Sequence, residues 1–120
     1  MLFRSQRVPN SHDVFGYQAD IGQQYWGSLE ISYEESRRNR IVVDARKAGV
    51  ENILKKKGWN EYVIRCQRDR IVLELNGLRT ADYRETDPSI ARSGIIALQL
   101  HGSGPQEVQF KNIRLKTLGK

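Results

Sequence analysis

The sequence predicts an all-β fold, a sandwich of two antiparallel sheets. Between Gly58 and Lys116, short segments alternate apolar with polar residues and are separated by turn signals. No long stretch has a helical period, no internal repeat is visible, and no Pro/Gly/Ser-rich linker divides the chain. We therefore expect a single domain that spans residues 1–120 and has a two-layer core.

Residues 61–83 predict a three-stranded antiparallel meander. The pair Asn76-Gly77 lies between its second and third strands, where a type I′ hairpin requires two positive φ angles. Residues 84–93 then form a loop, because Pro88 has no N–H to donate to a strand ladder. The expected strands are 61–67, 71–76 and 78–83, and the side chains expected in the core from the first two are Tyr62, Ile64, Cys66, Ile71, Leu73 and Leu75.

Two further strands are predicted at residues 94–101 and 107–116. In the first, alternation places Gln99 and His101 together on one face. The opposite face, expected in the core, carries Ile96, Leu98 and Leu100. In the second, the apolar phase changes midway, which predicts a β-bulge near Lys111-Asn112 because the side-chain period of a strand is two.

The first half of the chain has weaker patterns. The expected elements are strands at 3–8, 15–21 and 41–44 and a loop at 9–14. In the strand at 15–21, Gln18 and Asp20 point away from the apolar face. That apolar face carries Phe15, Tyr17, Ala19 and Ile21. Residues 48–57 offer at most one helical turn, because Gly49 and three consecutive lysines disfavour a longer one.

The composition limits the classes of function. A net charge of +6 would suit a polyanion, but the basic clusters are short and lack interleaved aromatic residues, so we expect no nucleic-acid partner. The single cysteine, Cys66, excludes a multi-cysteine metal site, and we expect neither a metal nor a cofactor. No apolar run is long enough to span a bilayer and no secretory signal is visible, so the chain as written is expected in the cytoplasm.

A series of motifs resembles the 3-keto-disaccharide hydrolase domain family. The motifs are FRS at 3–5, GYQADIG at 16–22, YWGSL at 25–29, YEESRRNR at 33–40, GWNEYVIRC at 58–66, LNGLRTADY at 75–83, DPSIARSGIIALQLH at 87–101 and VQFKNIRLK at 108–116. They follow one another in the family's order through nearly the whole chain, which is more specific than any one motif. The resemblance implies a concanavalin A-like jelly roll with a carbohydrate site on its concave face, usually in periplasmic or secreted bacterial proteins.

The sequence departs from this family in two places. The strands that precede the FRS motif in the family are absent here, so we expect the sandwich to be incomplete at its N-terminus. Residues 30–32 also look inserted relative to the family's spacing. An incomplete sandwich leaves unpaired sheet edges, through which a homo-oligomer could form.

The resemblance implies cleavage of a glycosidic bond in a 3-keto sugar. A ketone at C3 acidifies the hydrogen at C2, so a base can remove it while an acid protonates the departing oxygen, and water then adds to the unsaturated ketone. On this resemblance, Asp20 or Glu35 would be the base, and His101 the acid or a substrate ligand. The residues expected to bind substrate are Arg4, Gln18, Arg37 and Gln99.

Each of these assignments has a plainer alternative. Gln18 and Asp20 could form the solvated face of a strand, and His101 an exposed strand end. Glu35 and Arg37 could belong to a surface ion-pair run, which contributes only about 0–1 kcal/mol to stability. Three functions therefore stay open: a hydrolase or lyase of 3-keto-glycosides, a non-catalytic lectin-like module on the same fold, or a sandwich fragment that only assembles.

Overall fold

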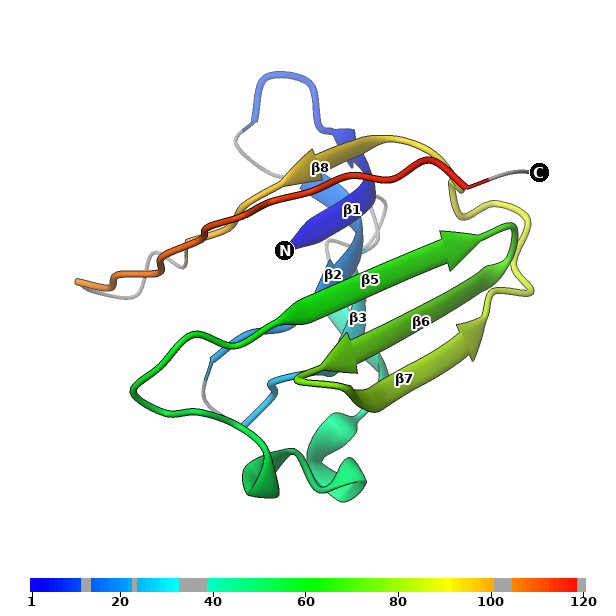
Figure 1. Ribbon diagram of the computed structural model, residues 1–120. Helices are drawn as coiled ribbons and strands as arrows, with labels where there is room; N and C mark the ends of the chain where they lie inside the picture. Colours follow the sequence, from blue (N-terminus) through cyan, green and yellow to red (C-terminus); the bar gives the residue numbers. More distant parts are fainter. Residues whose placement is uncertain (12–13, 23, 33–38, 101–104, 119–120) are drawn as a thin grey trace.

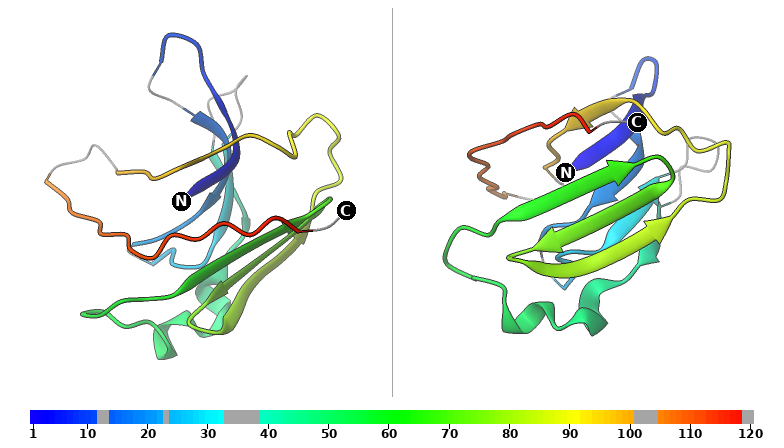
Figure 2. Two further views of the ribbon diagram at one scale, coloured as in Figure 1. Left: turned by 45° about the horizontal axis from the view of Figure 1, so that its top comes forward. Right: turned by 45° about the vertical axis from the view of Figure 1, so that its right-hand side comes forward.

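The protein folds into two layers of antiparallel β-sheet, which confirms the predicted all-β sandwich (Figures 1 and 2). The structure is a computed structural model that describes residues 1–11, 14–22, 24–32, 39–100 and 105–118. One sheet has five strands in the order β4-β3-β2-β1-β8, and the other has three in the order β5-β6-β7. Within the described residues, no helix has the length and apolar character that a membrane span requires.

The strands and short helical turns have the following bounds. The five-stranded sheet contains β1 (Leu2–Arg7), β2 (Val14–Ala19), β3 (Leu29–Ser32), β4 (Asn39–Val43) and β8 (Ile95–Ala97). The three-stranded sheet contains β5 (Tyr62–Gln67), β6 (Arg70–Leu75) and β7 (Leu78–Arg84). Two 3₁₀ turns, η1 (Ala45–Ala48) and η2 (Val50–Asn52), connect the sheets where the sequence allowed one helical turn.

The core lies between the two sheets and receives side chains from both. Alternation along each strand sends every second residue inward, so apolar residues spaced two apart meet across the layers. The buried members of this cluster are Phe3, Tyr17, Ala19, Leu29, Ile31, Ile71, Leu73 and Ala81. The rings of Phe3 and Tyr17 stack with centroids 5.7 Å apart. A smaller cluster of Ala45, Val50 and Leu75 continues the core beneath η1 and η2.

The predicted meander is confirmed in strand order, facing and turn. Asn76 and Gly77 have φ angles of 49° and 84°, as a type I′ turn requires. The Asn76 side chain also accepts a hydrogen bond from the Glu61 N–H at 2.8 Å and donates to the Ile53 carbonyl at 3.0 Å. The turn residue therefore joins its hairpin to the preceding loop as well as reversing the chain.

Both expectations for the end of the chain need correction. Of the described residues 94–100 in the predicted strand 94–101, Ile95–Ala97 are paired, as the edge strand β8. The side chains expected in the core, Ile96, Leu98 and Leu100, are 50%, 48% and 58% exposed. No strand is assigned in residues 107–116, so the positive φ of Asn112, 54°, is a bend in unpaired chain and not a β-bulge. Alternation predicted a two-sided strand, but it could not supply the partner strand that would cover one side.

The segment that looked inserted lies in β3, an interior strand of the five-stranded sheet. Its residue Ile31 is 1% exposed in the core, and its neighbours in the sheet are β2 and β4. The expected strand at 41–44 is present as β4 and the one at 15–21 as β2, each displaced by a residue or two. Because β3 lies between β2 and β4, residues 30–32 form part of the five-stranded sheet.

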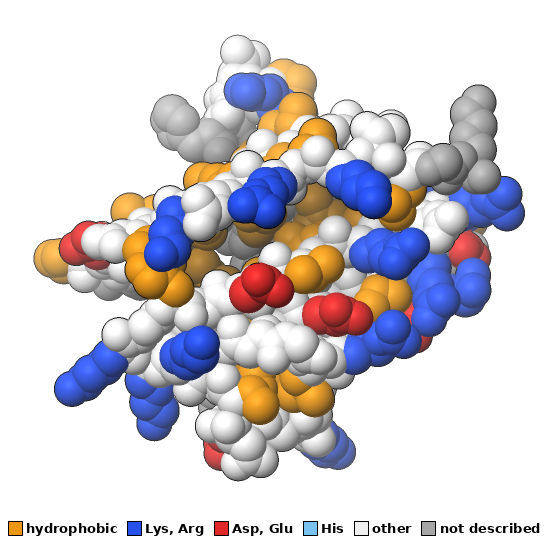
Figure 3. Space-filling model, in the orientation of Figure 1, with side chains coloured by type: hydrophobic (Ala, Val, Ile, Leu, Met, Phe, Trp, Pro, Cys, Tyr) orange, Lys and Arg blue, Asp and Glu red, His pale blue; other side chains and the backbone are white. Residues whose placement is uncertain are grey.

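The outer face of the three-stranded sheet is charged. Val63 and Val72 form an apolar floor, and cross-strand ion pairs such as Arg70–Asp82 (2.7 Å) surround it. An open hollow of about 320 Å³ lies over this face, and its lining includes none of the residues predicted for the site. Figure 3 shows acidic and basic side chains interspersed with apolar atoms there. The paired charges are typical of a solvated sheet face.

Candidate functional site

The candidate site lies on the face of the five-stranded sheet that points away from the three-stranded sheet. Because Tyr17, Ala19, Leu29 and Ile31 point into the core, the residues between them point to the opposite face. The strand register aligns one row of side chains across all five strands on that face. The row consists of Ala97, Leu2, Gln18, Glu30 and Ile41.

Asp20 lies just beyond this row, where β2 turns toward β3. Its N–H donates to the Ser28 carbonyl at 3.0 Å, and the Gly27 N–H donates to the Asp20 carbonyl at 3.1 Å, so the ladder continues past the strand end. Gln18 Nε2 donates to Asp20 Oδ1 at 2.6 Å. The sheet therefore brings together two of the residues predicted for the site and fixes the orientation of the carboxyl group.

The Asp20 carboxyl is almost completely buried, with 6% of the residue exposed. Burial and the neighbouring Glu30 raise the pKa of Asp20 to about 7, against the opposing effect of the Gln18 hydrogen bond. The Tyr62 hydroxyl donates to the Asp20 carbonyl at 3.2 Å, and burial together with Asp20 raises the pKa of that hydroxyl. A carboxyl group with a pKa near 7 can both accept and donate a proton at neutral pH.

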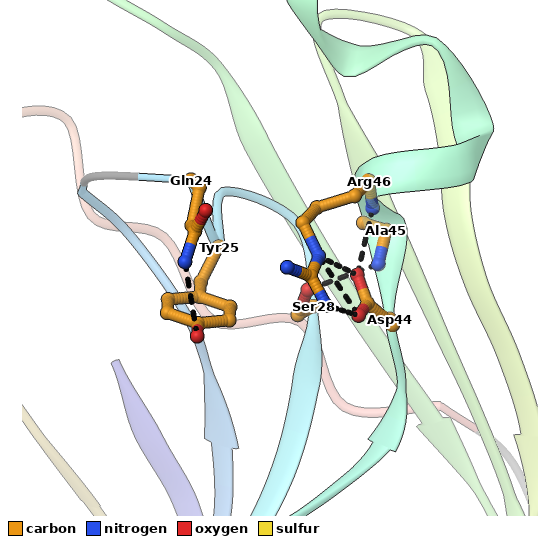
Figure 4. Close-up of polar contacts among 6 residues, drawn as sticks. All are labelled: Gln24, Tyr25, Ser28, Asp44, Ala45 and Arg46. Carbon is orange, nitrogen blue, oxygen red and sulfur yellow. Dashed lines mark hydrogen bonds and ion pairs between the residues drawn. The ribbon is translucent and has the colours of Figure 1, made fainter.

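The loop that closes on Asp20 is held in place by η1 (Figure 4). Asp44 accepts the Arg46 N–H at 3.0 Å and caps η1, and its carboxylate also receives the Arg46 guanidinium. That guanidinium lies 5.5 Å from the centroid of the Tyr25 ring. The Ala45 N–H donates to Ser28 Oγ at 2.9 Å in a buried contact. These contacts hold both ends of the segment 25–28 and so position Asp20 opposite Ser28.

The remaining predicted residues have different surroundings. Gln99 is exposed and follows Ala97 of β8 by two residues, as Asp20 follows Gln18 in β2. Because β1 is antiparallel to both β2 and β8, these two strands run in the same direction. Gln99 and Asp20 therefore follow the row on the same side of it. Arg4 is not brought to Asp20: its Nη1 donates to the carbonyl of Arg68 in the opposite sheet at 2.7 Å. The predicted residues Glu35, Arg37 and His101 lie outside the described part of the chain.

Glu30 is a member of the row that the sequence did not reveal. It is the cross-strand partner of Gln18 and is close enough to affect the titration of Asp20. The signal available was its position two residues after Ser28 in an alternating segment, SLEIS, which is typical of a strand. Because residues 30–32 look inserted relative to the family's spacing, this alternation alone does not predict a strand that contains Glu30.

Two other potentially reactive groups in the described residues, the Cys66 thiol and the Glu85 carboxylate, are packed or hydrogen-bonded within the fold. The Cys66 thiol is half-buried in β5 and its pKa is raised by burial, which disfavours the reactive thiolate. The buried carboxylate of Glu85 accepts hydrogen bonds from the Tyr17 and Tyr83 hydroxyls at 2.8 and 3.1 Å. Across the described ranges, no three His, Cys, Asp or Glu side chains are grouped to hold a metal ion.

Comparison with known proteins identifies the family. No curated protein and no solved structure matches the chain. The model of one family, described as the 3-keto-alpha-glucoside-1,2-lyase-like domain, matches residues 1–116. The match covers all the strands, the row of side chains across them and Asp20, in agreement with the resemblance seen in the sequence. The chain therefore belongs to the family of 3-keto-alpha-glucoside-1,2-lyase-like domains.

Proposed function

We propose that this domain cleaves the glycosidic bond of a 3-keto-glycoside by elimination, followed by hydration. The observation that carries the proposal is the buried Asp20 carboxyl, held by Gln18 on the face of the five-stranded sheet that points away from the other sheet, in a chain that belongs to this lyase-like family. The partner is accordingly a saccharide. We further propose that the sandwich has the concanavalin A-like jelly-roll topology of the family.

The proposed reaction begins with removal of the C2 hydrogen as a proton. Asp20, in its ionised form, takes this proton, and the electron pair of the C–H bond forms an enolate with the C3 ketone. The enolate then expels the glycosidic oxygen from C1, which takes a proton from an acid, and an unsaturated ketone remains. Addition of water across its double bond yields the free 3-keto sugar, so the net reaction is hydrolysis.

The roles of the other residues follow from their positions. Gln18 would orient the Asp20 carboxyl, and Gln99 would contact the sugar from the β8 end of the row. From the family resemblance, Glu35 keeps its proposed role as the alternative base, Arg37 as a ligand, and His101 as the acid or a substrate ligand. The guanidinium of Arg4 is engaged with the Arg68 carbonyl, which argues against contact with the substrate.

The direct test is incubation of the protein with a 3-keto-α-glucoside and detection of the released 3-keto sugar by NMR. Wild-type protein should release it at least about 100-fold faster than D20A, because loss of a general base typically costs a factor of 10²–10⁴. The variant E35A shows whether Glu35 shares this role. Binding of the glycoside without release above the D20A rate would favour a lectin-like module and contradict the enzyme.

We also propose that the domain self-associates through its open edges. The favouring observation is a set of six large hydrophobic side chains in β8, residues 98–100 and residues 105–118 that are between 39% and 80% exposed. These are Ile96, Leu98, Leu100, Val108, Ile113 and Leu115. An edge strand such as β8 is a template on which another copy can add strands, and exposed apolar side chains favour such association.

A further inference from the structure

One oxygen of Asp20 has no partner. Oδ2 is buried and receives no hydrogen bond from any described residue, whereas Oδ1 accepts one from Gln18. Glu85 is equally buried, with 6% of the residue exposed, yet each of its oxygens accepts a tyrosine hydroxyl. A buried ionised oxygen without a donor costs free energy, so the state of Asp20 needs an explanation that Glu85 does not.

The nearest candidate for that partner is Glu30. Glu30 pairs with Gln18 across β2 and β3, and the Asp20 N–H bonds to the Ser28 carbonyl, so Asp20 and Glu30 are diagonal neighbours on one face. Glu30 is close enough to Asp20 to raise the pKa of the Asp20 carboxyl. Two ionised carboxylates hold no hydrogen and cannot bond, whereas a single proton between them satisfies both.

We infer that Asp20 and Glu30 form a proton-sharing pair, in which one proton lies between Asp20 Oδ2 and the Glu30 carboxyl. The pair then carries one negative charge instead of two. The inference rests on the proposed function for its catalytic consequence: the pair gains a second proton when the C2–H bond of the substrate breaks, and it can return that proton to the departing oxygen. Glu30 is the positioning residue of this pair.

The groups around Asp20 come from both sheets. Glu30 lies beside it from β3, and the Met1 amino group, which precedes β1, donates to the Ala19 carbonyl at 2.8 Å. The Tyr62 hydroxyl of β5, in the opposite sheet, donates to the main-chain carbonyl of Asp20. Burial and Glu30 raise the pKa of Asp20, while Gln18 and the amino group lower it. Apart from burial, Glu30 is the group whose removal should lower that pKa most.

The experiment is a ¹³C NMR titration of the side-chain carboxyl groups in wild type, E30Q and D20N, with no substrate present. The control is E74Q, because Glu74 lies on the outer face of the other sheet and pairs with Arg79 at 3.8 Å. The Asp20 resonance should show two inflections in wild type and E74Q. In E30Q it should show one, with the midpoint lowered by at least about one pH unit.

Two results would overturn the pair. One is an Asp20 midpoint in E30Q that lies within about 0.3 pH units of the wild-type midpoint, because the pair predicts a shift of at least about one unit. The other is an Asp20 midpoint that rises in R37A and is unchanged in E30Q, which would assign Oδ2 to a cation. D20N identifies the Asp20 resonance, because that resonance must be absent from its spectrum.

The titration is independent of turnover, so it separates this inference from the proposed function. If the protein releases no 3-keto sugar but Asp20 shows two inflections that E30Q reduces to one, the proton-sharing pair is present and the proposed reaction is not. If the protein is active, E30Q should move the acid limb of kcat/KM against pH toward lower pH by the same amount as the Asp20 midpoint. An active E30Q variant with an unchanged pH profile would contradict the role given to Glu30.

Discussion

At the scale of single residues, the carboxyl groups of this protein differ by their hydrogen-bond donors. The exposed carboxylates Asp44 and Asp82 have arginine partners that hold their pKa values below the ordinary range. Asp20 is buried with one amide donor and a second carboxyl group beside it, and its pKa is raised to about 7. The same residue type therefore has a lowered pKa beside arginine on the surface and a raised pKa where it is buried beside a second carboxyl group.

Asp20 should make the stability of the fold depend on pH. Its folded pKa lies above that of an unfolded aspartate, so the folded state binds a proton that the unfolded state has lost between about pH 4 and 7. The stabilising contribution is fully present below about pH 4 and is lost as the pH rises through about 7. The variant D20N removes this dependence, because its side chain does not titrate.

The measurement is denaturant unfolding of wild type and D20N at several pH values. The stability of D20N relative to wild type should increase by roughly 2–4 kcal/mol between pH 4 and pH 8, at about 1.4 kcal/mol for each unit of pKa difference. Carboxylates with lowered pKa values, such as Asp44, are common to both proteins and cancel. A difference that stays constant across this range would show that Asp20 is not perturbed.

Residue-level prediction from the sequence succeeded where the period of two was applied. Gln18 and Asp20 were expected on one face and are joined by a hydrogen bond, because alternation alone decides which side chains share a face. The burial of Asp20 could not be predicted, since it depends on residues 24–28 returning to the end of β2, where Gly27 and Ser28 hydrogen-bond to the main chain of Asp20. Glu30 could not be paired with Gln18 without knowing the register of β3.

At the scale of elements, the loop between β2 and β3 fixes the position of Asp20. Gly27 and Gly22 both have positive φ angles, 86° and 96°, but their surroundings differ. A Cβ at Gly27 would lie 2.8 Å from the Thr80 side chain, whereas a Cβ at Gly22 would have nothing within 4 Å. Thr80 Oγ1 also donates to the Gly27 carbonyl at 2.8 Å, which joins this loop to β7.

Substitution of these two glycines separates backbone strain from close packing. G22A should cost about 1–2 kcal/mol of unfolding free energy, because alanine disfavours a positive φ. G27A should cost at least about 1–3 kcal/mol more, since the methyl group also has to displace buried Thr80. Denaturant unfolding of the two variants checks this. Equal losses would show that the loop adjusts freely and does not hold Asp20 against β7.

Element prediction succeeded for β5, β6 and β7 because their signals are local. Alternation and the Asn76-Gly77 turn determine a hairpin without reference to the rest of the chain. The strand expected at 107–116 failed because a strand needs a partner, and alternation does not report whether one is present. The short strand β3 was missed because its neighbours β2 and β4 are what make it a strand.

At the scale of the whole molecule, the two sheets share one core but leave apolar side chains exposed in the edge strand β8 and in the chain that follows it. Leu115 is 80% exposed and Ile113 59% exposed, and both follow the bend at Asn112. The sequence could predict two antiparallel sheets from its many short alternating segments. It could not predict the strand order or which edge stays open, because these depend on pairings between distant segments.

The exposed edge predicts association that depends on protein concentration. Wild type should form a defined oligomer in light scattering, and I113K and L115K should shift it toward the monomer, because a lysine opposes burial of that surface. V63K is the matched control, since Val63 is 43% exposed on the outer face of β5. A wild type that stays monomeric over a hundredfold range of about micromolar concentrations would rule out this interface.

The most direct test of the central claim, elimination assisted by Asp20, is turnover of a 3-keto-α-glucoside that carries deuterium at C2. Wild type and E74Q should release the 3-keto sugar more slowly from the deuterated substrate than from the ordinary one, because the C2–H bond breaks in the step that Asp20 assists. D20N should lose at least about 100-fold in rate. Equal release from both substrates, together with an active D20N variant, would contradict the account.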